Sequence, residues 1–190
     1  MINFRTVTIG DSSVGKTSIV NRILWNEFDH SEASTIGASY ELYSEIRNGE
    51  KIELQIWDTA GQEEYRSLAP LYFRNSNGAM LVFDISKKST FESANYWYET
   101  FQSVVGSSFV VVLIGNKADL DNEREVSKEE AEEWASAHNC RYFEASALTG
   151  FGIKNALKVF IDGLLQSRKA PSVPKVPAPI TDNKQNSGCC

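Results

Sequence analysis

Apolar positions follow two different spacings along this chain of 190 residues. Short and nearly continuous apolar runs, such as residues 109–114, are typical of buried strands, whereas longer segments carry an apolar residue at every third or fourth position, as amphipathic helices do. The two kinds of segment alternate from residue 4 to about residue 167. Because buried strands separated by helices form a parallel sheet that is covered on both faces, the pattern predicts a doubly wound α/β domain.

The boundaries of these segments give a set of expected elements. Strands are expected at residues 4–10, 78–86, 108–116 and 141–146, and helices at residues 15–28, 89–105, 127–139 and 153–166. Residues 40–58 alternate in polarity around Asn48-Gly49, a pair typical of hairpin turns, and therefore predict two antiparallel strands. Ser89 and Ser127 are each followed by a glutamate three residues later, which predicts a side-chain N-cap at both helix starts. The expected sheet has six strands and is parallel except for one strand of the hairpin.

Composition indicates the size and surroundings of the fold. With 42% hydrophobic and 23% charged residues, the chain has the balance of one globular domain that needs no disulfide or metal for stability. Its three cysteines favour a reducing compartment, and Cys140 is expected to be a small buried apolar side chain. The sequence has no N-terminal leader pattern and no apolar run long enough to span a bilayer, so we expect a protein made and kept in the cytosol. His30 and His138 are expected at the surface.

Residues 168–190 differ in character from the rest of the chain. They contain four of the five prolines and no apolar period, which predicts a flexible tail after a folded domain of residues 1–167. Four basic residues and one acidic residue give the tail a charge of +3, which leaves −9 on the folded part for a total of −6. This acidic balance, without a large basic patch, disfavours a nucleic-acid partner. Cys189 and Cys190 are poorly placed to bridge each other, because adjacent Cα atoms lie about 3.8 Å apart and disulfides prefer roughly 4.4–6.8 Å.

A glycine-rich motif stands between the first expected strand and the first expected helix. Residues 10–17, GDSSVGKT, match the pattern G-x-x-x-x-G-K-[ST]. In that setting the glycines let the backbone wrap around phosphate oxygens, Lys16 reaches the β and γ phosphates, and the Thr17 hydroxyl can ligate Mg²⁺. An accidental match in a turn rich in glycine and serine is the alternative, and the strand-to-helix context disfavours it. The motif predicts a nucleoside triphosphate site.

Further polar segments follow strands, at the edge where open α/β sheets bind ligands. In the DTAGQ segment, Asp58 can hold the water shell of a metal, and the Gly61 N–H is free to meet a γ-phosphate. In the NKAD segment, Asp119 can accept two hydrogen bonds from the N–H and NH₂ edge that guanine has and adenine lacks. Ser146 and Ala147 follow the next strand. Each segment alone could be an ordinary polar turn, but together they predict a guanine nucleotide site.

The order and spacing of GDSSVGKT, Thr35, WDTAGQE, NKAD and SAL resemble those of Ras-like small GTPases, over residues 4 to about 167. The stretches LQIWDTAGQE, YRSLAPLYFR and LVFDIS, with the cysteine pair, are similar to the Rab family, and SSVGKTSIV, STIGASY and SLAPLYFR are similar to its endocytic branch. The resemblance implies a P-loop NTPase fold, hydrolysis of GTP to GDP and phosphate, and regulation of vesicle and membrane traffic. A P-loop nucleotide kinase and a nucleotide-bound scaffold without hydrolysis are the alternatives. The first lacks a segment long enough for an acceptor lid, and Gln62 and Thr35 weigh against the second.

The resemblance also implies roles for single residues. The catalytic residues would be Gln62, which orients the attacking water, with Lys16, Gly61 and Thr35; Mg²⁺ would be held by Thr17, Thr35 and Asp58. The residues expected around GTP or GDP are Gly10, Ser12, Ser13, Val14, Gly15, Lys16, Thr17, Ser18, Phe28, Thr35, Gly61, Asn116, Lys117, Asp119, Ser146, Ala147 and Leu148. Phe28 would lie edge-on to the base, although a core position is the alternative. Hydrolysis should be slow without an activating protein, because Arg66 and Arg74 are expected in the mobile segment after Gly61 or on its partner surface.

The implied partners follow from two further features. Tyr40, Trp57 and Tyr72 resemble the aromatic triad through which Rabs meet effectors, with a core position as the alternative for Trp57. Cys189 and Cys190 resemble a double prenylation site, with an unmodified disordered end as the alternative. An exchange factor, an activating protein, effectors and a prenylation escort are therefore expected. The G domain is expected to be monomeric, in the cytosol and on the cytoplasmic face of an intracellular membrane, with an endosome as the expected compartment.

Three positions depart from the pattern of the family. Leu148 stands where a lysine is usual, which removes a polar side chain over the base but leaves recognition by the backbone. Ser39 replaces an acidic residue of many Rabs, which puts contacts with the escort in question. Ser13 stands where glycine is frequent, but a serine at this position is within what the resemblance to the endocytic branch implies.

Overall fold

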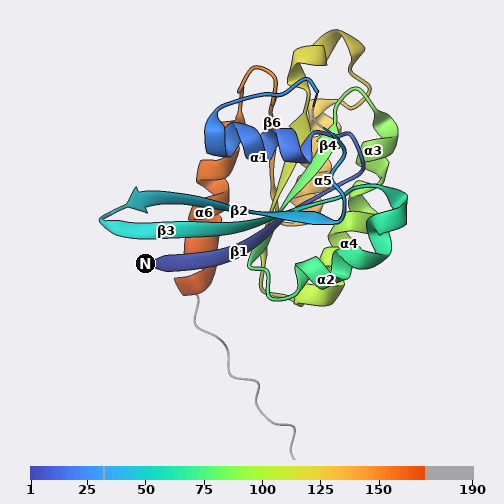
Figure 1. Cartoon of the computed structure of the whole chain (residues 1–190). Coiled ribbons are helices and arrows are strands. Elements are labelled where there is room, and N and C mark those ends of the chain that lie inside the picture. Colours follow the sequence, from blue (N-terminus) through green and yellow to red (C-terminus); the bar gives the residue numbers. More distant parts are fainter. Residues whose placement is uncertain (32, 170–190) are drawn as a thin grey trace, which may run out of the picture.

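Within residues 1–31 and 33–169, which the computed structural model describes, six strands form one sheet in the order β2-β3-β1-β4-β5-β6 (Figure 1). The strands are β1 (Ile2–Ile9), β2 (Ala38–Arg47), β3 (Glu50–Thr59), β4 (Gly78–Asp84), β5 (Val110–Asn116) and β6 (Arg141–Glu144). The helices are α1 (Lys16–Trp25), α2 (Ala69–Phe73), α3 (Lys88–Glu92), α4 (Ala94–Val105), α5 (Lys128–Ala137) and α6 (Ile153–Lys169), with the 3-10 helices η1 (Glu63–Leu68) and η2 (Ala118–Glu123). Cys189 and Cys190 lie outside the described residues.

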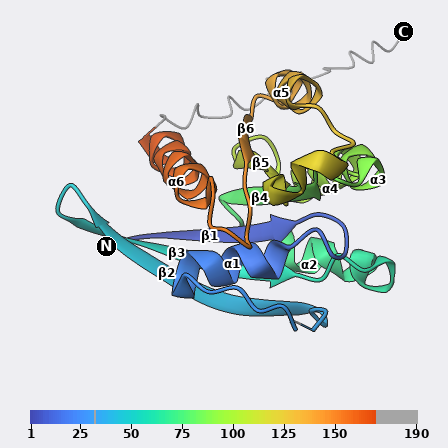
Figure 2. The ribbon, with the colours of Figure 1, turned by 90° about the horizontal axis from the view of Figure 1, so that it is seen from above.

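The directions of the five parallel strands place their carboxyl ends at one edge of the sheet. β1 pairs with β3 and β4, β4 pairs with β5, and β5 pairs with β6, all in parallel. β2 runs antiparallel to β3, and the turn at Asn48-Gly49 joins them. This hairpin extends beyond the other strands in both ribbon views (Figures 1 and 2). The prediction of a doubly wound α/β sheet with one antiparallel strand is confirmed.

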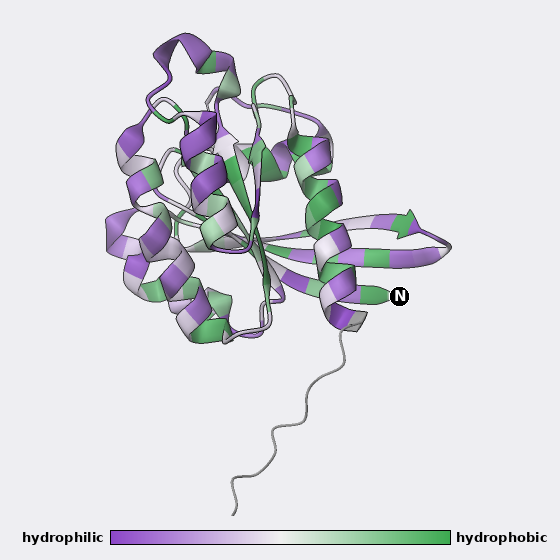
Figure 3. Ribbon diagram, turned by 180° about the vertical axis from the view of Figure 1, so that it is seen from behind, coloured by the Kyte–Doolittle hydropathy of each residue, from purple (hydrophilic) through white to green (hydrophobic). Residues whose placement is uncertain are grey.

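Two apolar layers cover the faces of the sheet. Side chains of α1 and α6, such as Ile19 and Phe160, pack on one face, and side chains of α2, α4 and α5, such as Phe73 and Trp97, pack on the other. β4 is buried along its whole length and β5 along almost all of it, which agrees with the continuous apolar runs in the sequence. Figure 3 shows the central strands mostly in the green of apolar residues, between helices that carry both colours. None of the helices in the described ranges combines the length and the apolar character that crossing a bilayer requires.

The predicted cap at Ser89 is wrong. α3 begins at Lys88, and Ser89 lies inside the helix. The Thr90 hydroxyl donates a hydrogen bond to the Lys87 carbonyl at 2.8 Å, so a threonine fixes the turn at which the helix begins. The single helix predicted for residues 89–105 is also divided, because Ser93 separates α3 from α4 and its hydroxyl bonds back to the Ser89 carbonyl at 3.1 Å.

Other local predictions have mixed outcomes. Ser127 caps α5 as predicted, since its hydroxyl accepts the Glu130 N–H at 3.2 Å. α6 continues to Lys169 rather than ending at Gln166. Cys140 is half-buried and packs against the core that α4 and α5 share, and burial raises the pKa of its thiol to about 12. It is therefore an unreactive packing residue.

Candidate functional site

A cavity of about 360 Å³ lies at the carboxyl edge of the sheet. Its wall comes from the loop between β1 and α1, the segment before β2, the end of β3, and the loops after β5 and β6. The expected site residues that line it are Ser12, Ser13, Gly15, Lys16, Thr17, Ser18, Phe28, Thr35, Gly61, Gln62, Asn116, Lys117, Asp119, Ala147 and Leu148. Loops that are far apart in the sequence thus enclose one space.

Four expected site residues stand behind the cavity wall. Gly10, Val14, Asp58 and Ser146 are buried and do not line the cavity. Each of them is hydrogen-bonded to a residue that does line it. The pairs are Gly10 with Lys16, Val14 with Asn116, Asp58 with Thr17, and Ser146 with Asp119. The four residues therefore hold the lining in place.

The cavity also has lining residues that were not among the expected site residues. They are Asp29, His30, Ala33, Ser34, Thr59 and Ala60. The segment between Phe28 and Thr35 has no apolar period, so only these two flanking residues gave a signal for its path. His30 is exposed, as expected, and its ring meets the Phe28 ring edge to face at 4.9 Å. Phe28 both lines the cavity and packs against the core under α1 and α6, so its two interpretations are compatible.

Lys16 places a buried positive charge at one end of the cavity. Its side chain donates to the Gly10 carbonyl at 3.0 Å and to the Asp11 carbonyl at 2.7 Å, and the residue is 6% exposed. Burial lowers the pKa of this ammonium to about 8, although Asp58 and Asp11 favour the charged form. An anionic ligand would relieve this cost of burial, so this end of the cavity suits phosphate.

Gly15 brings the loop between β1 and α1 close to the loop after β5. Its φ of 93° is a value that side chains rarely allow, and a Cβ at this position would lie 2.3 Å from the Asn116 amide nitrogen. The glycine of the motif is therefore required by a close approach as well as by its backbone conformation.

Three oxygen-bearing side chains meet next to Lys16. The hydroxyls of Thr17 and Thr35 are 2.8 Å apart, and the Thr17 hydroxyl donates to an Asp58 carboxylate oxygen at 2.5 Å. Thr8, which the sequence did not point to, donates to the other Asp58 oxygen at 2.5 Å. Burial raises the pKa of Asp58, while the bonds from Thr17 and Thr8 and the charge of Lys16 oppose the change. Oxygen donors of this kind are what Mg²⁺ prefers.

The other end of the cavity is built around Asn116. Its amide donates to the Val14 carbonyl at 2.8 Å and accepts the Ala147 N–H at 3.1 Å. Asp119 accepts a hydrogen bond from the Ser146 hydroxyl, which leaves a carboxylate on the cavity wall. The two loops that carry the expected guanine contacts are thus bonded to each other and to the phosphate loop.

Lys117 is held by a carboxylate at the end of β4. Its ammonium lies 2.7 Å from the Asp84 carboxylate, which is buried. Burial alone would raise the pKa of Asp84, but hydrogen bonds from Lys117 and Ser86 outweigh it and the pKa is lowered. The stem of Lys117 can therefore lie along the cavity wall while its charge is compensated.

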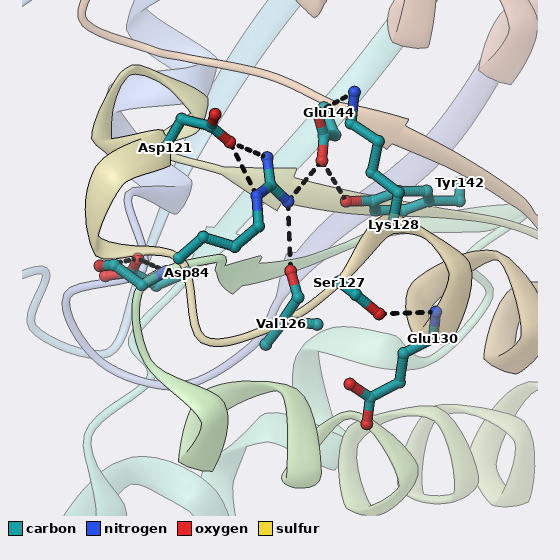
Figure 4. Close-up of polar contacts among 10 residues, drawn as sticks. Asp84, Asp121, Val126, Ser127, Lys128, Glu130, Tyr142 and Glu144 are labelled. Carbon is teal, nitrogen blue, oxygen red and sulfur yellow. Dashed lines mark hydrogen bonds and ion pairs between the residues drawn. The ribbon is translucent and has the colours of Figure 1, made fainter.

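Arg124 connects the segments that follow β5 and β6. Its guanidinium bonds Asp121 of η2 at 2.7 Å and Glu144, at the end of β6, also at 2.7 Å. It also donates to the Val126 carbonyl at 3.1 Å, and the Tyr142 hydroxyl donates to the same Glu144 oxygen at 3.3 Å. Asp121, Val126, Tyr142 and Glu144 are labelled among these polar contacts in Figure 4. The ion pair fixes the start of one base loop against the end of the other.

The three aromatic residues expected at an effector surface lie together on β2, β3 and α2. The Trp57 ring is 5.4 Å from that of Tyr40 and 5.9 Å from that of Tyr72. Arg5 of β1 lies over Trp57 at 4.4 Å and donates to the Tyr72 carbonyl at 3.1 Å. Trp57 is partly buried against the core of α2 and α4, whereas Tyr40 is 48% exposed, so the cluster reaches from the core to the surface.

The fold and these loops define a P-loop nucleoside triphosphatase of the small G domain type. A model of the Ras family matches residues 5–166. The GTP-binding protein ypt3 of Schizosaccharomyces pombe is 39% identical over 158 residues, which cover 83% of this chain and 74% of that protein. The Ras-related protein Rab11A of Lotus japonicus is 41% identical over 153 residues, which cover 80% of this chain and 68% of that protein.

The chain belongs to the Ras family, as a small GTPase of the Rab type. It binds guanine nucleotides, hydrolyses GTP to GDP and regulates vesicle traffic, as the motifs predicted. Members of the family work with regulators and effectors. The interpretation as a nucleotide kinase is not favoured.

Proposed function

We propose that the chain is a Mg²⁺-dependent GTP switch of endocytic membrane traffic, in which the residues around the cavity have the roles given below. The main support is that one cavity has two chemically different ends. The buried cation of Lys16 and the oxygens of Thr17 and Thr35 lie at one end, and the carboxylate of Asp119 lies at the other. The first end suits a triphosphate with its metal, and the second suits the edge of guanine.

The oxygen cluster is proposed to hold Mg²⁺. Thr17 and Thr35 would offer hydroxyls, and Asp58, which is buried behind Thr17, would act through water. When bound, the ion neutralises charge on the β and γ phosphates. Lys16 and the N–H groups from Gly10 to Gly15 would hold the remaining phosphate oxygens.

Hydrolysis would depend on positioning more than on covalent chemistry. Gln62, on the cavity wall, would orient the attacking water, and the Gly61 N–H would contact the γ-phosphate. Among the described residues that line the cavity, none is an arginine. Negative charge on the transferred group would therefore be only partly compensated, and we expect an activating protein to raise the rate by roughly 10³–10⁵.

Two neighbouring segments would change conformation according to which nucleotide is bound. Thr35 and Gly61 lie on the segments before β2 and after β3, which are joined by a hydrogen bond from the Ala60 N–H to the Gly37 carbonyl at 2.8 Å. Loss of the γ-phosphate would release both segments together. The effector surface beside them would consist of Tyr40, Trp57 and Tyr72.

Membrane attachment is proposed on the sequence alone. Cys189 and Cys190 would each carry a prenyl group, because one lipid chain anchors a protein only marginally and two anchor it stably. A G domain of residues 1–167 and a tail of residues 168–190 would then move between the cytosol, with an escort, and the cytoplasmic face of an endosomal membrane. Mass spectrometry of the protein from a eukaryotic host, against a variant with both cysteines changed to serine, tests this part.

A nucleotide titration tests the central proposal. The full chain, stripped of nucleotide, is titrated with fluorescent GDP and ADP in Mg²⁺, and we expect guanine to bind at least about 10⁴-fold more tightly. Asp119→Asn should exchange this preference for xanthine, whereas Glu123→Gln, an exposed carboxylate of the same 3-10 helix, should leave it unchanged. Equal affinity for GDP and ADP, or unchanged GDP affinity in Asp119→Asn, would remove the proposed base site.

A further inference from the structure

Asp11, the second residue of the phosphate loop, meets the segment after β3 at two separate points. A Cβ on Gly61 would lie 2.3 Å from the Asp11 carbonyl carbon and 2.4 Å from its oxygen, so the two backbones are in direct contact. The Asp11 carboxylate accepts a hydrogen bond from Arg66 at 3.0 Å. Gln62 lies in the chain between these two contacts.

The carboxylate of Asp11 is also fixed by the core. Trp97 of α4, which is fully buried, donates its indole N–H to the same Asp11 oxygen at 2.8 Å. The guanidinium of Arg66 lies 5.3 Å from the centre of the Tyr96 ring and 5.7 Å from that of the Trp97 ring. The side chains of Arg66 and Asp11 are only 32% and 16% exposed, so water screens their charges incompletely. A continuous set of contacts therefore runs from the core of α4 to η1.

The segment between the two contacts forms a turn that leads into η1. Gln62 has an extended backbone, with φ −67° and ψ 144°, and its carbonyl accepts the Tyr65 N–H at 3.0 Å at the start of η1. Both ends of residues 61–66 are held against Asp11. The backbone of Gln62 therefore lies between two contacts with Asp11.

We infer that Asp11, Arg66 and Trp97 are positioning residues for GTP hydrolysis, which hold residues 61–66 so that Gln62 stays on the cavity wall. The inference rests on the proposed role of Gln62. Arg66 would then act by holding the segment and not by contacting the phosphate as an arginine finger does, since its guanidinium is bonded to Asp11 and does not line the cavity.

Arg66→Gln in the full chain is the decisive variant. We expect single-turnover hydrolysis of bound GTP to fall about tenfold, less than the ~100-fold that a 1 Å misplacement can cost. Dissociation of fluorescent GDP should stay within about twofold of wild type, because the phosphate contacts are unchanged. Arg66→Lys should recover part of the rate, since it keeps the charge. The matched control is Arg74→Gln, which removes the same charge from an exposed residue just after α2 and should hydrolyse at the wild-type rate.

The other two residues show whether the contacts act as one unit. Trp97→Phe should slow hydrolysis as well, and Asp11→Asn combined with Arg66→Gln should be no slower than the slower single variant. Unchanged hydrolysis in Arg66→Gln, an equal loss in Arg74→Gln, or full additivity of the two substitutions would overturn the inference. If Asp11→Asn or Trp97→Phe melts below the assay temperature, the comparison of Arg66→Gln with Arg66→Lys decides. A Gln62→Ala variant that hydrolyses GTP as fast as the wild-type protein would instead contradict the proposed role of Gln62.

Discussion

Replacement of Arg124 by alanine should speed the release of guanine nucleotide. Arg124 donates to Glu144 at 2.7 Å, and the two side chains are 19% and 12% exposed. A charge-assisted hydrogen bond with so little exposure contributes about 1.5–3 kcal/mol. The pair with Asp121, which is 72% exposed, adds at most about 1 kcal/mol. We therefore assign about 2 kcal/mol to the contacts of Arg124.

This energy bears on the nucleotide because of where Arg124 is placed. η2, which contains Asp119, precedes it directly, and Glu144 lies two residues before Ser146. If half of the lost stabilisation comes from the nucleotide-bound state, about 1 kcal/mol, dissociation becomes about fivefold faster; if all of it does, about 30-fold faster. The expected range for Arg124→Ala is therefore about 5- to 30-fold.

Displacement of fluorescent GDP by excess GDP, at fixed Mg²⁺ and salt, measures this rate. Arg124→Lys should be intermediate. Arg141→Ala removes an exposed arginine from the start of the same strand, β6, and should release GDP at the wild-type rate. A wild-type rate for Arg124→Ala in a protein with a lowered Tm would refute the reasoning, because the ion pair would then stabilise the fold without holding the base loops.

Three further predictions concern other parts of the molecule. Gly15→Ala should abolish tight GDP binding, because the new Cβ would lie 2.3 Å from the Asn116 amide, and a Kd within about threefold of wild type would contradict this. The Cys140 thiol of the folded protein should react with a disulfide reagent far more slowly than that of the protein unfolded in urea. Burial raises its pKa from 9.0 to about 12, so the thiolate fraction at pH 8 is about a thousandfold lower in the folded protein, and the reaction rate of the folded protein should increase with pH. Tyr40→Ala should weaken capture of effectors, while GDP affinity stays within about twofold, since Tyr40 is 48% exposed and its ring contacts Trp57 rather than the cavity; parallel losses of both would argue against a separate effector surface.

The position of the glycine-rich motif in the fold could be predicted because its information is local. The motif from Gly10 to Thr17 lies within one strand-turn-helix unit, so its setting follows from neighbouring apolar positions. The meeting of the loops that carry Asp119 and Ser146 could be predicted for a related reason, since each loop follows a buried strand and parallel strands end at one edge. The predicted end of α1 was less accurate. Asn26 adopts a positive φ and its N–H donates to the Arg22 carbonyl, which ends the helix at Trp25 rather than near Phe28.

Contacts between distant segments could not be predicted from the sequence. Asp11 bonds residues that are 55 and 86 positions away, and nothing in the local pattern relates them. His138 shows the same limit: it was expected at the surface, but it is half-buried, because its ring meets that of Tyr98, on α4, at 4.8 Å as well as stacking on Trp134 of its own helix. Such pairs depend on the packing of whole elements.

The side chain of Asn116 has a consequence for the choice of ligand. One planar amide spans the Val14 carbonyl and the Ala147 N–H, and its two ends cannot move independently. The separation between the parts of the cavity that suit a purine and a polyphosphate is thus set by a rigid group of fixed length. Guanine alone or pyrophosphate alone would make only one half of the contacts. A nucleoside diphosphate would make both halves while losing the translational freedom of one molecule, so it should bind more tightly than either part. Molecules whose two halves are separated by a longer or shorter linker should be rejected even when each half is correct.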